Sequence, residues 1–215
     1  MGRFQLLAFD MDGVLADTSA CHAAAYADLW RRLGVDGPPY EEIAGRKTLD
    51  VVGEQTALLR PSAAQIAEWS ALKQELARRR LAAGALLFAD TIPCLQALAE
   101  HGFRMALATG GSRAAAEIVL LDGPVAVCFS SVATGDDVER GKPAPDLYLL
   151  TLERTGCAAG KTLVIEDSMA GIAAGIAAGA WVASVRSGAR VDHRRFVGSY
   201  PDLAGLAAML GVPVR

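Results

Sequence analysis

Short apolar runs alternate with longer amphipathic stretches along most of the chain. The compact runs lie at 4–9, 103–108, 125–129, 162–166 and 181–185. Runs of this length, bounded by polar or turn residues, are typical of buried parallel strands, and helical patterns lie between most of them. Strands that alternate with helices form right-handed βαβ units. We therefore predict an α/β fold, in which helices cover both faces of a Rossmann-like, doubly wound parallel sheet.

Residues 17–88 interrupt this alternation, because they contain helical patterns with no convincing strand between them. Within them, Ser62 and Gln65 form an S-x-x-Q capping box, which predicts the start of a long helix. We therefore predict a discontinuous α/β core domain of residues 1–16 and 89–215, with an α-helical cap domain of residues 17–88 inserted into it.

Composition narrows the possible partners. The chain has 215 residues, of which 52% are apolar, so it can bury the core of a large domain and of a second lobe. Its 21 basic and 24 acidic residues give a net charge of −3, which indicates no nucleic-acid surface and no cationic face for a membrane. The first apolar run is too short for a signal peptide, and the four cysteines are far apart. We expect a cytoplasmic protein that is a monomer or a weak dimer.

The first apolar run ends in two acids within the stretch FDMDGVLADT. Asp10 and Asp12 are two positions apart, so in an extended segment their side chains point the same way. Open α/β sheets bind ligands at the carboxyl ends of their strands. Asp and Gly after a strand are also ordinary turn residues, so this pair indicates a site only if other groups join it.

Further polar clusters follow the later apolar runs. Each alone would also fit a helix cap or a solvated loop charge. Because all of them follow apolar runs, they favour one shared site at one edge of the sheet. The clusters contain Thr109, Gly110 and Gly111 in ATGGS, Lys142 in GKPAPD, and Glu166 and Asp167 in IEDSMAG.

This constellation resembles the haloacid dehalogenase superfamily of phosphotransferases over nearly the whole chain. DMDGVLADT matches the motif D-x-D-G-x-x-x-D-[ST], while Thr109, Lys142 and EDSMAG match the second, third and fourth motifs. The insertion after the first strand resembles the helical cap of the subgroup with phosphoglycolate phosphatase and beta-phosphoglucomutase. The resemblance implies Mg²⁺, an aspartyl-phosphate intermediate and a small phosphorylated substrate.

The resemblance also implies a division of labour between the two aspartates. Asp10 would be the covalent nucleophile, and Asp12 would protonate the leaving oxygen and then take a proton from the incoming nucleophile, which contributes roughly 10² to 10⁴-fold. Mg²⁺ would be held by Asp10, the backbone carbonyl of Asp12 and Asp167, with Glu166 bound to the ion or supporting its ligands.

The phosphate itself would be held by groups from other strand ends. Lys142 would place a positive charge on the phosphoryl oxygens in the transition state. Thr109 and the amide of Gly110 would hydrogen-bond the same group and orient it. Asp17 and Thr18, at the far end of the first motif, would brace the loop where the cap begins.

The cap should decide between a phosphatase and a mutase. Gly45 in IAGRKTLD resembles the glycine of the cap loop that reaches the active site. The mutase pattern has an arginine three residues later, where this chain has Thr48, whereas Arg46 directly follows the glycine as in many phosphatases. Arg46 or Lys47 remains able to reach a second anion. His22 is common to both activities, in substrate contact or in hinge packing.

We therefore predict a Mg²⁺-dependent phosphatase for a small phosphorylated metabolite, such as a sugar phosphate. The alternative within the enzymes is a sugar phosphate mutase similar to beta-phosphoglucomutase. A binding protein on the same fold, without catalysis, should lack a nucleophile, lysine or metal acid. Asp10, Asp12, Lys142 and Asp167 are all present.

Overall fold

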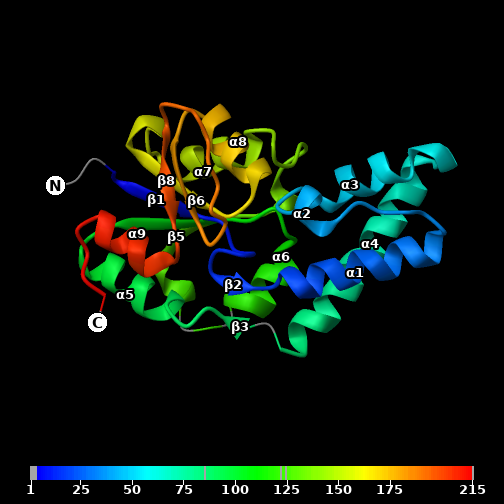
Figure 1. The fold of residues 1–215 in the computed structure, drawn as a ribbon, viewed down its shortest axis with the longest axis horizontal. Helices are drawn as coiled ribbons and strands as arrows, with labels where there is room; N and C mark the ends of the chain where they lie inside the picture. The colour runs from blue at the N-terminus through cyan, green and yellow to red at the C-terminus, as the bar shows by residue number, and fades with distance from the viewer. Residues whose placement is uncertain (1–3, 85, 122, 124, 215) are drawn as a thin grey trace.

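A six-stranded sheet forms the centre of the α/β part of the chain (Figure 1). The computed structural model describes residues 4–84, 86–121, 123 and 125–214. The sheet has the order β5-β4-β1-β6-β7-β8, and every neighbouring pair is parallel. The strands are β1 (Leu6–Phe9), β4 (Arg104–Ala108), β5 (Phe129–Ala133), β6 (Thr162–Glu166), β7 (Trp181–Val185) and β8 (Phe196–Tyr200). The predicted α/β fold with a doubly wound parallel sheet is confirmed.

Helices cover both faces of this sheet (Figure 1). Along β1, Leu7 and Phe9 belong to the apolar core that includes residues of α5 and α9, whereas Ala8 belongs to the core that includes residues of α7 and α8. This alternation explains why β1 is apolar throughout, because both of its faces are buried. The helices are α5 (Thr91–Glu100), α6 (Arg113–Ala116), α7 (Asp146–Thr155), α8 (Met169–Ala177) and α9 (Leu203–Met209).

Small residues allow α8 to lie close to the sheet. A Cβ atom added at Gly175 would lie 2.8 Å from a methyl group of Val182 and 3.1 Å from one of Val164. The stretch of alanines and glycines around 170–184 therefore contains most of α8 and the start of β7, and α8 packs closely on β6 and β7. No helix among the described residues is both long and apolar enough to cross a membrane.

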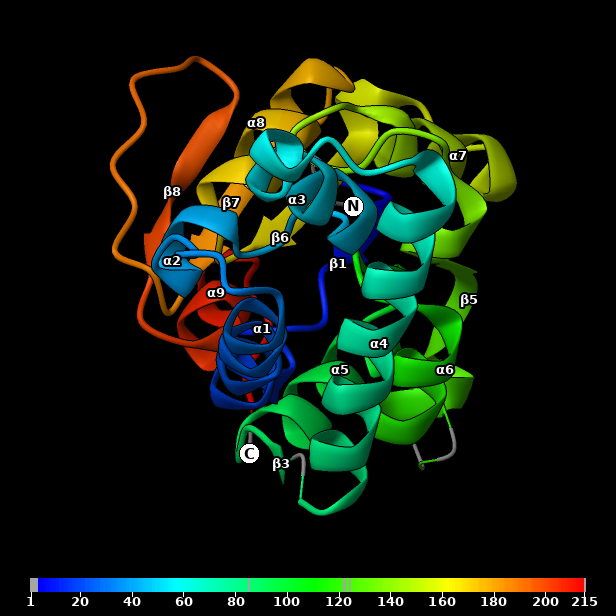
Figure 2. The same ribbon diagram turned by 90° about the vertical axis from the view of Figure 1, so that its right-hand side faces the viewer.

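The segment after β1 forms a group of helices at one end of the molecule, here called the cap (Figure 1), which faces the viewer in Figure 2. The longest of them begins as the sequence predicts, because Gln65 N donates to Ser62 Oγ at 3.3 Å and Ser62 N donates to Gln65 Oε1 at 2.9 Å. An antiparallel pair of short strands, β2 (Ala16–Asp17) and β3 (Leu86–Leu87), joins this part to the core. The cap helices are α1 (Ser19–Leu33), α2 (Tyr40–Ile43), α3 (Thr48–Gln55) and α4 (Ala63–Ala82).

The strand predicted at 125–129 is wrong in its position. Ala126–Cys128 is a short 3-10 helix, and β5 begins only at Phe129. Val127 is 91% exposed, so part of this apolar run is not in the core. The strand itself contains Ser130 and Ser131, which interrupt the apolar pattern by which strands were predicted. Such polar residues are tolerated because β5 is an edge strand, with a neighbouring strand on one side only. The other edge strand, β8, was not predicted for the same reason.

Candidate active site

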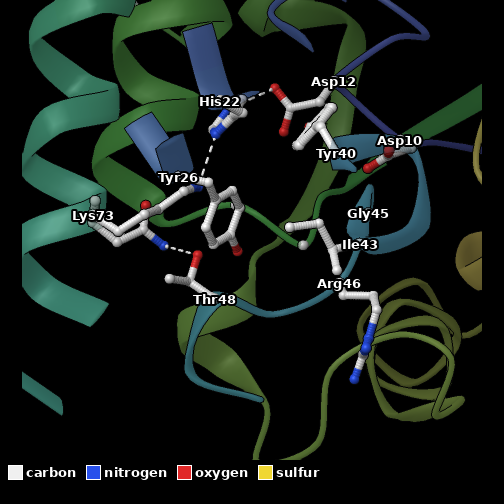
Figure 3. Close-up of a pocket in the computed structure, with 13 residues that line it drawn as sticks. Asp10, Asp12, His22, Tyr26, Tyr40, Ile43, Gly45, Arg46, Thr48 and Lys73 are labelled. Atoms are coloured by element: carbon white, nitrogen blue, oxygen red, sulfur yellow. Dashed lines mark hydrogen bonds and ion pairs between the residues drawn. The ribbon is translucent and has the colours of Figure 1, made fainter. Parts of the chain in front are cut away.

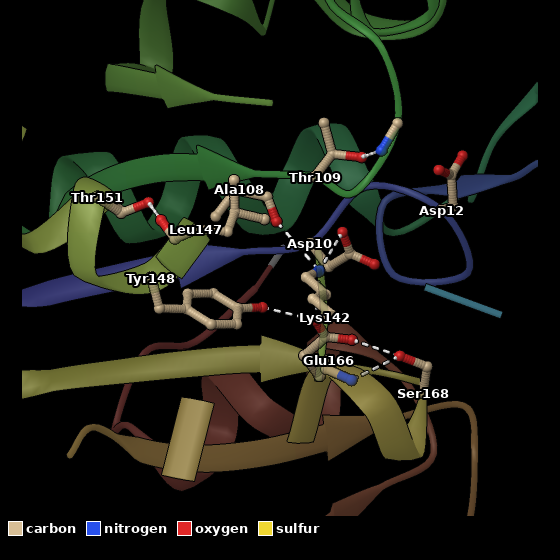
Figure 4. A network of polar contacts seen from close by, with 12 residues as sticks. Asp10, Asp12, Ala108, Thr109, Lys142, Leu147, Tyr148, Thr151, Glu166 and Ser168 are labelled. Atoms are coloured by element: carbon tan, nitrogen blue, oxygen red, sulfur yellow. Dashed lines mark hydrogen bonds and ion pairs between the residues drawn. The ribbon is translucent and has the colours of Figure 1, made fainter. Parts of the chain in front are cut away.

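Four polar segments meet at the carboxyl edge of the sheet (Figure 4). Asp10 directly follows β1 and Thr109 directly follows β4, and each continues the backbone ladder, with Asp10 N donating to Ile165 O at 2.9 Å and Thr109 N donating to Ala133 O at 3.0 Å. Glu166 is the last residue of β6. Because parallel strands all end at the same edge, residues far apart in the sequence come together there.

Lys142 lies buried between two of these acids. Its Nζ atom is 2.9 Å from Oδ1 of Asp10 and donates to Oε1 of Glu166 at 2.6 Å. It also donates to the backbone carbonyl of Ala108 at 3.3 Å. Burial alone lowers the pKa of Lys142, but the carboxylates of Asp10 and Glu166 raise it above its ordinary value. The ammonium therefore stays charged.

Glu166 is held by several side chains at once. Tyr148 Oη donates to its Oε1 atom at 2.5 Å, and Ser168 Oγ donates to its Oε2 atom at 3.1 Å. A Cβ atom at Gly171 would lie 1.9 Å from the carboxyl group of Glu166, so only glycine fits at this point of α8. These contacts fix the position of Glu166, and through it the position of Lys142.

Three carboxyl groups lie close together around Lys142, so the cluster has more acidic groups than basic ones. Oxygen atoms of Asp10, Glu166 and Asp167 lie within 4.8 Å of one another. Burial, followed by the charge of Glu166, raises the pKa of Asp167 to about 7 against the opposing charge of Lys142. Burial also raises the pKa of Asp10 well above its ordinary value, although Lys142 opposes this. Converging carboxylate oxygens with excess negative charge fit a hard divalent cation such as Mg²⁺.

Asp12 is in a different environment from Asp10. Thr18 Oγ1 donates to Oδ1 of Asp12 at 2.5 Å, and Nε2 of His22 lies 3.4 Å from the same oxygen (Figure 3). Burial alone raises the pKa of Asp12, but His22 and Thr18 together lower it to about 2. Both of these partners lie at the start of the cap, so the cap positions this carboxylate.

Lys73 is a second buried lysine, and it is not among the site residues predicted from the sequence. Its Nζ atom lies 3.0 Å from Nδ1 of His22 and 4.2 Å from the centre of the Tyr26 ring. Burial lowers the pKa of Lys73 to about 8, and Asp12 opposes this shift. The sequence holds one signal that was not used: Lys73 interrupts the apolar positions Trp69, Leu72 and Leu76 of its helix. A lysine on such a face needs a buried partner.

A cavity lies between the core and the cap, next to the two aspartates. It has an empty volume of about 390 Å³, which includes its open mouth. The core contributes the two aspartates and two glycines, and the cap contributes a mostly neutral, polar wall. The cavity is lined by Asp10, Asp12, Gly110 and Gly111 from the core, and by His22, Tyr26, Tyr40, Ile43, Gly45, Arg46, Thr48, Lys73 and Gln74 from the cap.

Two glycines allow the cap to approach the core. A Cβ atom at Gly45 would lie 2.4 Å from Oγ of Ser168, and the backbone φ of +74° at Gly45 also favours glycine. A Cβ atom at Gly110 would lie 2.6 Å from the carbonyl oxygen of Gly45. The cap loop therefore touches the core on two sides of the cavity.

Of the cap residues predicted from the sequence, some line the cavity and one does not. His22, Arg46 and Thr48 line the cavity, but the guanidinium of Arg46 points away from the aspartates, with Nη2 2.5 Å from Oε1 of Glu54 (Figure 3). Lys47 does not line this cavity. Its Nζ atom donates to the backbone carbonyls of Val138 and Glu139, at 2.6 and 3.2 Å, so it ties the cap to the loop before Lys142.

The segment after β4 places its small residues beside the aspartates. Gly110 and Gly111 line the cavity, while Thr109 is fully buried and its Oγ1 atom accepts a hydrogen bond from Gly111 N at 3.0 Å. Ser112 caps the helix that follows, because its Oγ atom accepts from Ala115 N at 3.3 Å. The predicted phosphate-binding residues Thr109, Gly110 and Lys142 therefore lie at one edge of the sheet.

Comparison with known proteins agrees with this arrangement. The family model of haloacid dehalogenase-like hydrolases matches residues 4–179. Fructose-1-phosphate phosphatase YqaB of Escherichia coli (strain K12) is 31% identical over 189 residues, which cover 86% of this chain and 97% of that protein. Hexitol phosphatase A of the same strain is 32% identical over 191 residues, which cover 83% and 82% of the two chains.

Solved structures agree as well. The crystal structure of CbbY from Rhodobacter sphaeroides in complex with phosphate has a TM-score of 0.76 and 26% sequence identity, covering 94% of this chain and 96% of that one. The fold is α/β, with a carboxylate-lined site at the carboxyl edge of its parallel sheet. The chain belongs to the haloacid dehalogenase-like hydrolase family, which confirms the resemblance in its sequence.

Proposed function

We propose that this chain is a Mg²⁺-dependent phosphatase that hydrolyses a small phosphorylated metabolite, namely a sugar phosphate or a similar phosphomonoester. One observation carries the proposal: Asp10 and Asp12 line the same cavity but have opposite surroundings. Asp10 is paired with Lys142 at the edge of the sheet, whereas Asp12 is held by residues at the start of the cap. The phosphatase names of the two relatives from Escherichia coli support the same class of reaction.

The two aspartates take successive parts in the reaction. A carboxylate oxygen of Asp10 attacks phosphorus, and the bond between phosphorus and the ester oxygen breaks. A phosphate dianion beside Asp12 raises the pKa of that carboxyl, so Asp12 carries the proton that it gives to the leaving oxygen. Asp12 then takes a proton from water as the water oxygen attacks phosphorus. Inorganic phosphate leaves, and Asp10 is free again.

A metal ion fits the cluster of acids. Asp10, the backbone carbonyl of Asp12 and Asp167 would hold Mg²⁺, with Glu166 fixed beside them by its contacts to Tyr148 and Ser168. When bound, the ion supplies positive charge against the repulsion between Asp10 and the phosphate dianion, about 4 kcal/mol per charge pair at 4 Å and an effective dielectric constant of 20.

The remaining residues orient the phosphoryl group. Lys142 is charged and already lies 2.9 Å from Asp10, so it sits where the transferred group passes. Thr109 and the backbone amide of Gly110 provide hydrogen-bond donors on the neighbouring strand end. These positions are fixed before substrate arrives, because Lys142 and Thr109 are buried.

The cap favours a phosphatase over a mutase. Thr48 stands where the mutase pattern has an arginine, and the guanidinium of Arg46 is engaged by Glu54. Neither residue presents a free guanidinium for a second phosphate. All four residues that an inactive relative would be expected to lose are present, namely Asp10, Asp12, Lys142 and Asp167.

We also propose that residues 17–88 form a cap domain that moves relative to the core of residues 1–16 and 89–215. The short strands β2 and β3 at the two crossings support this division. Residues 1–3, 85, 122, 124 and 215 of these ranges lie outside the described part of the chain. We further propose a cytoplasmic enzyme that is a monomer or a weak dimer, which the four free cysteines support with respect to its compartment.

The test is release of free phosphate. The purified protein is incubated with fructose 1-phosphate, sorbitol 6-phosphate and a wider panel of phosphorylated metabolites, in Mg²⁺ and in EDTA. We expect Mg²⁺-dependent release that Asp10→Asn abolishes without loss of the fold. Substantial Mg²⁺-dependent release by Asp10→Asn overturns the nucleophile assignment, and no release by the wild type from any compound overturns the proposed function.

A further inference from the structure

An unpaired hydrogen-bond acceptor lies in the cap wall of the cavity. The Oε1 atom of Gln74 is buried and has no hydrogen-bond partner within the described part of the chain. Gln74 lines the cavity together with both aspartates. A buried carbonyl oxygen without a partner is unfavourable, so the group is expected to have a partner when the site is filled.

The amide of Gln74 is also bound to Thr48. Nε2 of Gln74 donates to Oγ1 of Thr48 at 3.0 Å, which leaves Oε1 as the end of the amide without a partner among the described residues. Thr48 is itself buried and begins α3, while Gln74 lies on α4. Two helices of the cap therefore position the Oε1 atom, as a specificity site on rigid elements requires.

The cations of the cap wall are already engaged. Lys73 contacts His22, and the Nη2 atom of Arg46 pairs with Glu54. The phenols of Tyr26 and Tyr40 stay neutral, because burial raises the pKa of Tyr26 to about 12, opposed by Thr48, and burial and then Asp12 raise the pKa of Tyr40 well above its ordinary value. The wall opposite the carboxylates is therefore polar and largely without free charge.

The chemistry of the wall distinguishes a hydroxyl group from a second phosphate. A hydroxyl both donates and accepts, so it can donate to Oε1 of Gln74, whereas a phosphate dianion only accepts and would leave that oxygen unpaired.

We propose that Gln74 determines substrate specificity, by accepting a hydrogen bond from a hydroxyl of the leaving group through its Oε1 atom. The site then selects monophosphates whose leaving group is uncharged and carries several hydroxyls, over monophosphates without hydroxyls and over bisphosphates. This inference rests on the proposed phosphatase function. A site built to bind a hydroxyl rejects analogues that lack it, because its buried polar group is left unpaired.

The test compares two kinds of phosphate ester in Mg²⁺. Fructose 1-phosphate and sorbitol 6-phosphate carry hydroxyls, and propyl phosphate carries none. We expect kcat/KM of the wild type to be higher for the faster of the two hydroxylated esters than for propyl phosphate. Gln74→Met should lower the ratio of these two kcat/KM values by about 10- to 100-fold. Thr48→Val, which removes the anchor of Gln74, should lower the ratio by less. Gln55→Met makes the same change in the cap outside this cavity and should keep the ratio.

Fructose 1,6-bisphosphate gives an independent readout on charge. We expect the wild type to prefer fructose 1-phosphate to the bisphosphate, and Gln74→Met to reduce this preference. Melting temperatures of all variants establish that they fold.

The possible results distinguish the role of Gln74 from the proposed phosphatase function. An unchanged ratio in Gln74→Met overturns the inference. If kcat/KM falls equally for the hydroxylated esters and for propyl phosphate, the role of Gln74 is structural and the inference is overturned. A wild type that hydrolyses propyl phosphate as well as the hydroxylated esters also overturns it, while the phosphatase function stands. No hydrolysis of any ester in Mg²⁺ overturns both.

Discussion

The Nζ atom of Lys73 lies 3.0 Å from Nδ1 of His22, and both side chains are buried. The other ring nitrogen of His22 faces Asp12 at 3.4 Å. A charged Lys73 is a donor only, so it occupies Nδ1, and Nε2 is the ring atom that faces the carboxylate of Asp12. The cap thus orients His22 towards Asp12, and it does so from α4, a helix distant from β1 in the sequence.

His22→Phe tests this arrangement on activity. The variant keeps an aromatic ring but loses both nitrogens, so Asp12 loses a partner that holds its carboxyl group in position for proton transfer. Proton transfer to a poor leaving group should suffer more than transfer to a good one. We expect kcat/KM to fall roughly 10- to 100-fold for an alkyl phosphate and by less for an aryl phosphate. An equal fall for both esters would contradict this role.

Lys73→Met tests the same relationship on stability. The pKa of Lys73 is about 8 in the folded protein, below its ordinary 10.5. The unfolded chain therefore binds more protons between these pH values, so the wild type gains stability as pH rises from 8 to 10.5. A shift of this size corresponds to a cost of about 3 kcal/mol below pH 8.

We therefore expect Lys73→Met to raise the free energy of unfolding by about 1 to 3 kcal/mol at pH 7, with the gain shrinking towards pH 10.5. Activity should fall, because His22 loses its partner. Urea denaturation at pH 7 and pH 10 measures the difference, and Lys161→Met, at an exposed lysine, is the control. A variant that is less stable than the wild type at pH 7 would contradict the account.

Tyr148→Phe and Glu166→Gln separate two contributions to the buried network around Lys142. Tyr148→Phe removes one of the hydrogen bonds that Glu166 accepts, which we expect to cost about 1.5 to 3 kcal/mol of unfolding free energy. Glu166→Gln removes a charge that pairs with Lys142, and we expect a cost of about 3 kcal/mol, at the low end for a broken buried ion pair because Asp10 still pairs with that lysine. Urea denaturation gives both values. Equal losses would mean that the charge of Glu166 does not stabilise Lys142.

Metal binding is measurable without turnover. After removal of divalent ions with EDTA, addition of Mg²⁺ should raise the melting temperature of the wild type, because a ligand that binds only the folded state stabilises it. Asp167→Asn should lose most of this rise, and Asp192→Asn, at an exposed aspartate, should keep it. The same rise in Asp167→Asn would remove Asp167 from the metal site.

The sheet and the core half of the site were predictable from the sequence. Parallel strands bring their carboxyl ends to one edge, so Asp10, Thr109 and Glu166 could be placed together from the apolar runs that precede them. The run at 125–129 failed because apolar residues also fill the short 3-10 helix before β5. Local composition does not distinguish the two.

The cap half of the site was less predictable. His22 and Thr48 were found through their motif positions, but Lys73 and Gln74 reach the cavity only because α4 packs against α1 and α3. Lys47, named from the sequence as able to reach a second anion, donates to two backbone carbonyls of the core. Such contacts depend on how two separate parts of the chain meet, which no local pattern in the sequence records.

The most direct test of the central claim measures two products at once. The protein is incubated with Mg²⁺, beta-glucose 1-phosphate and a trace of glucose 1,6-bisphosphate, and in a second sample with Mg²⁺ and fructose 1-phosphate. Free phosphate and glucose 6-phosphate are measured in both. The account predicts release of free phosphate, absent in EDTA and in Asp10→Asn, without formation of glucose 6-phosphate. Formation of glucose 6-phosphate without phosphate release would contradict it, because the cap would then exclude water and the chain would be a mutase.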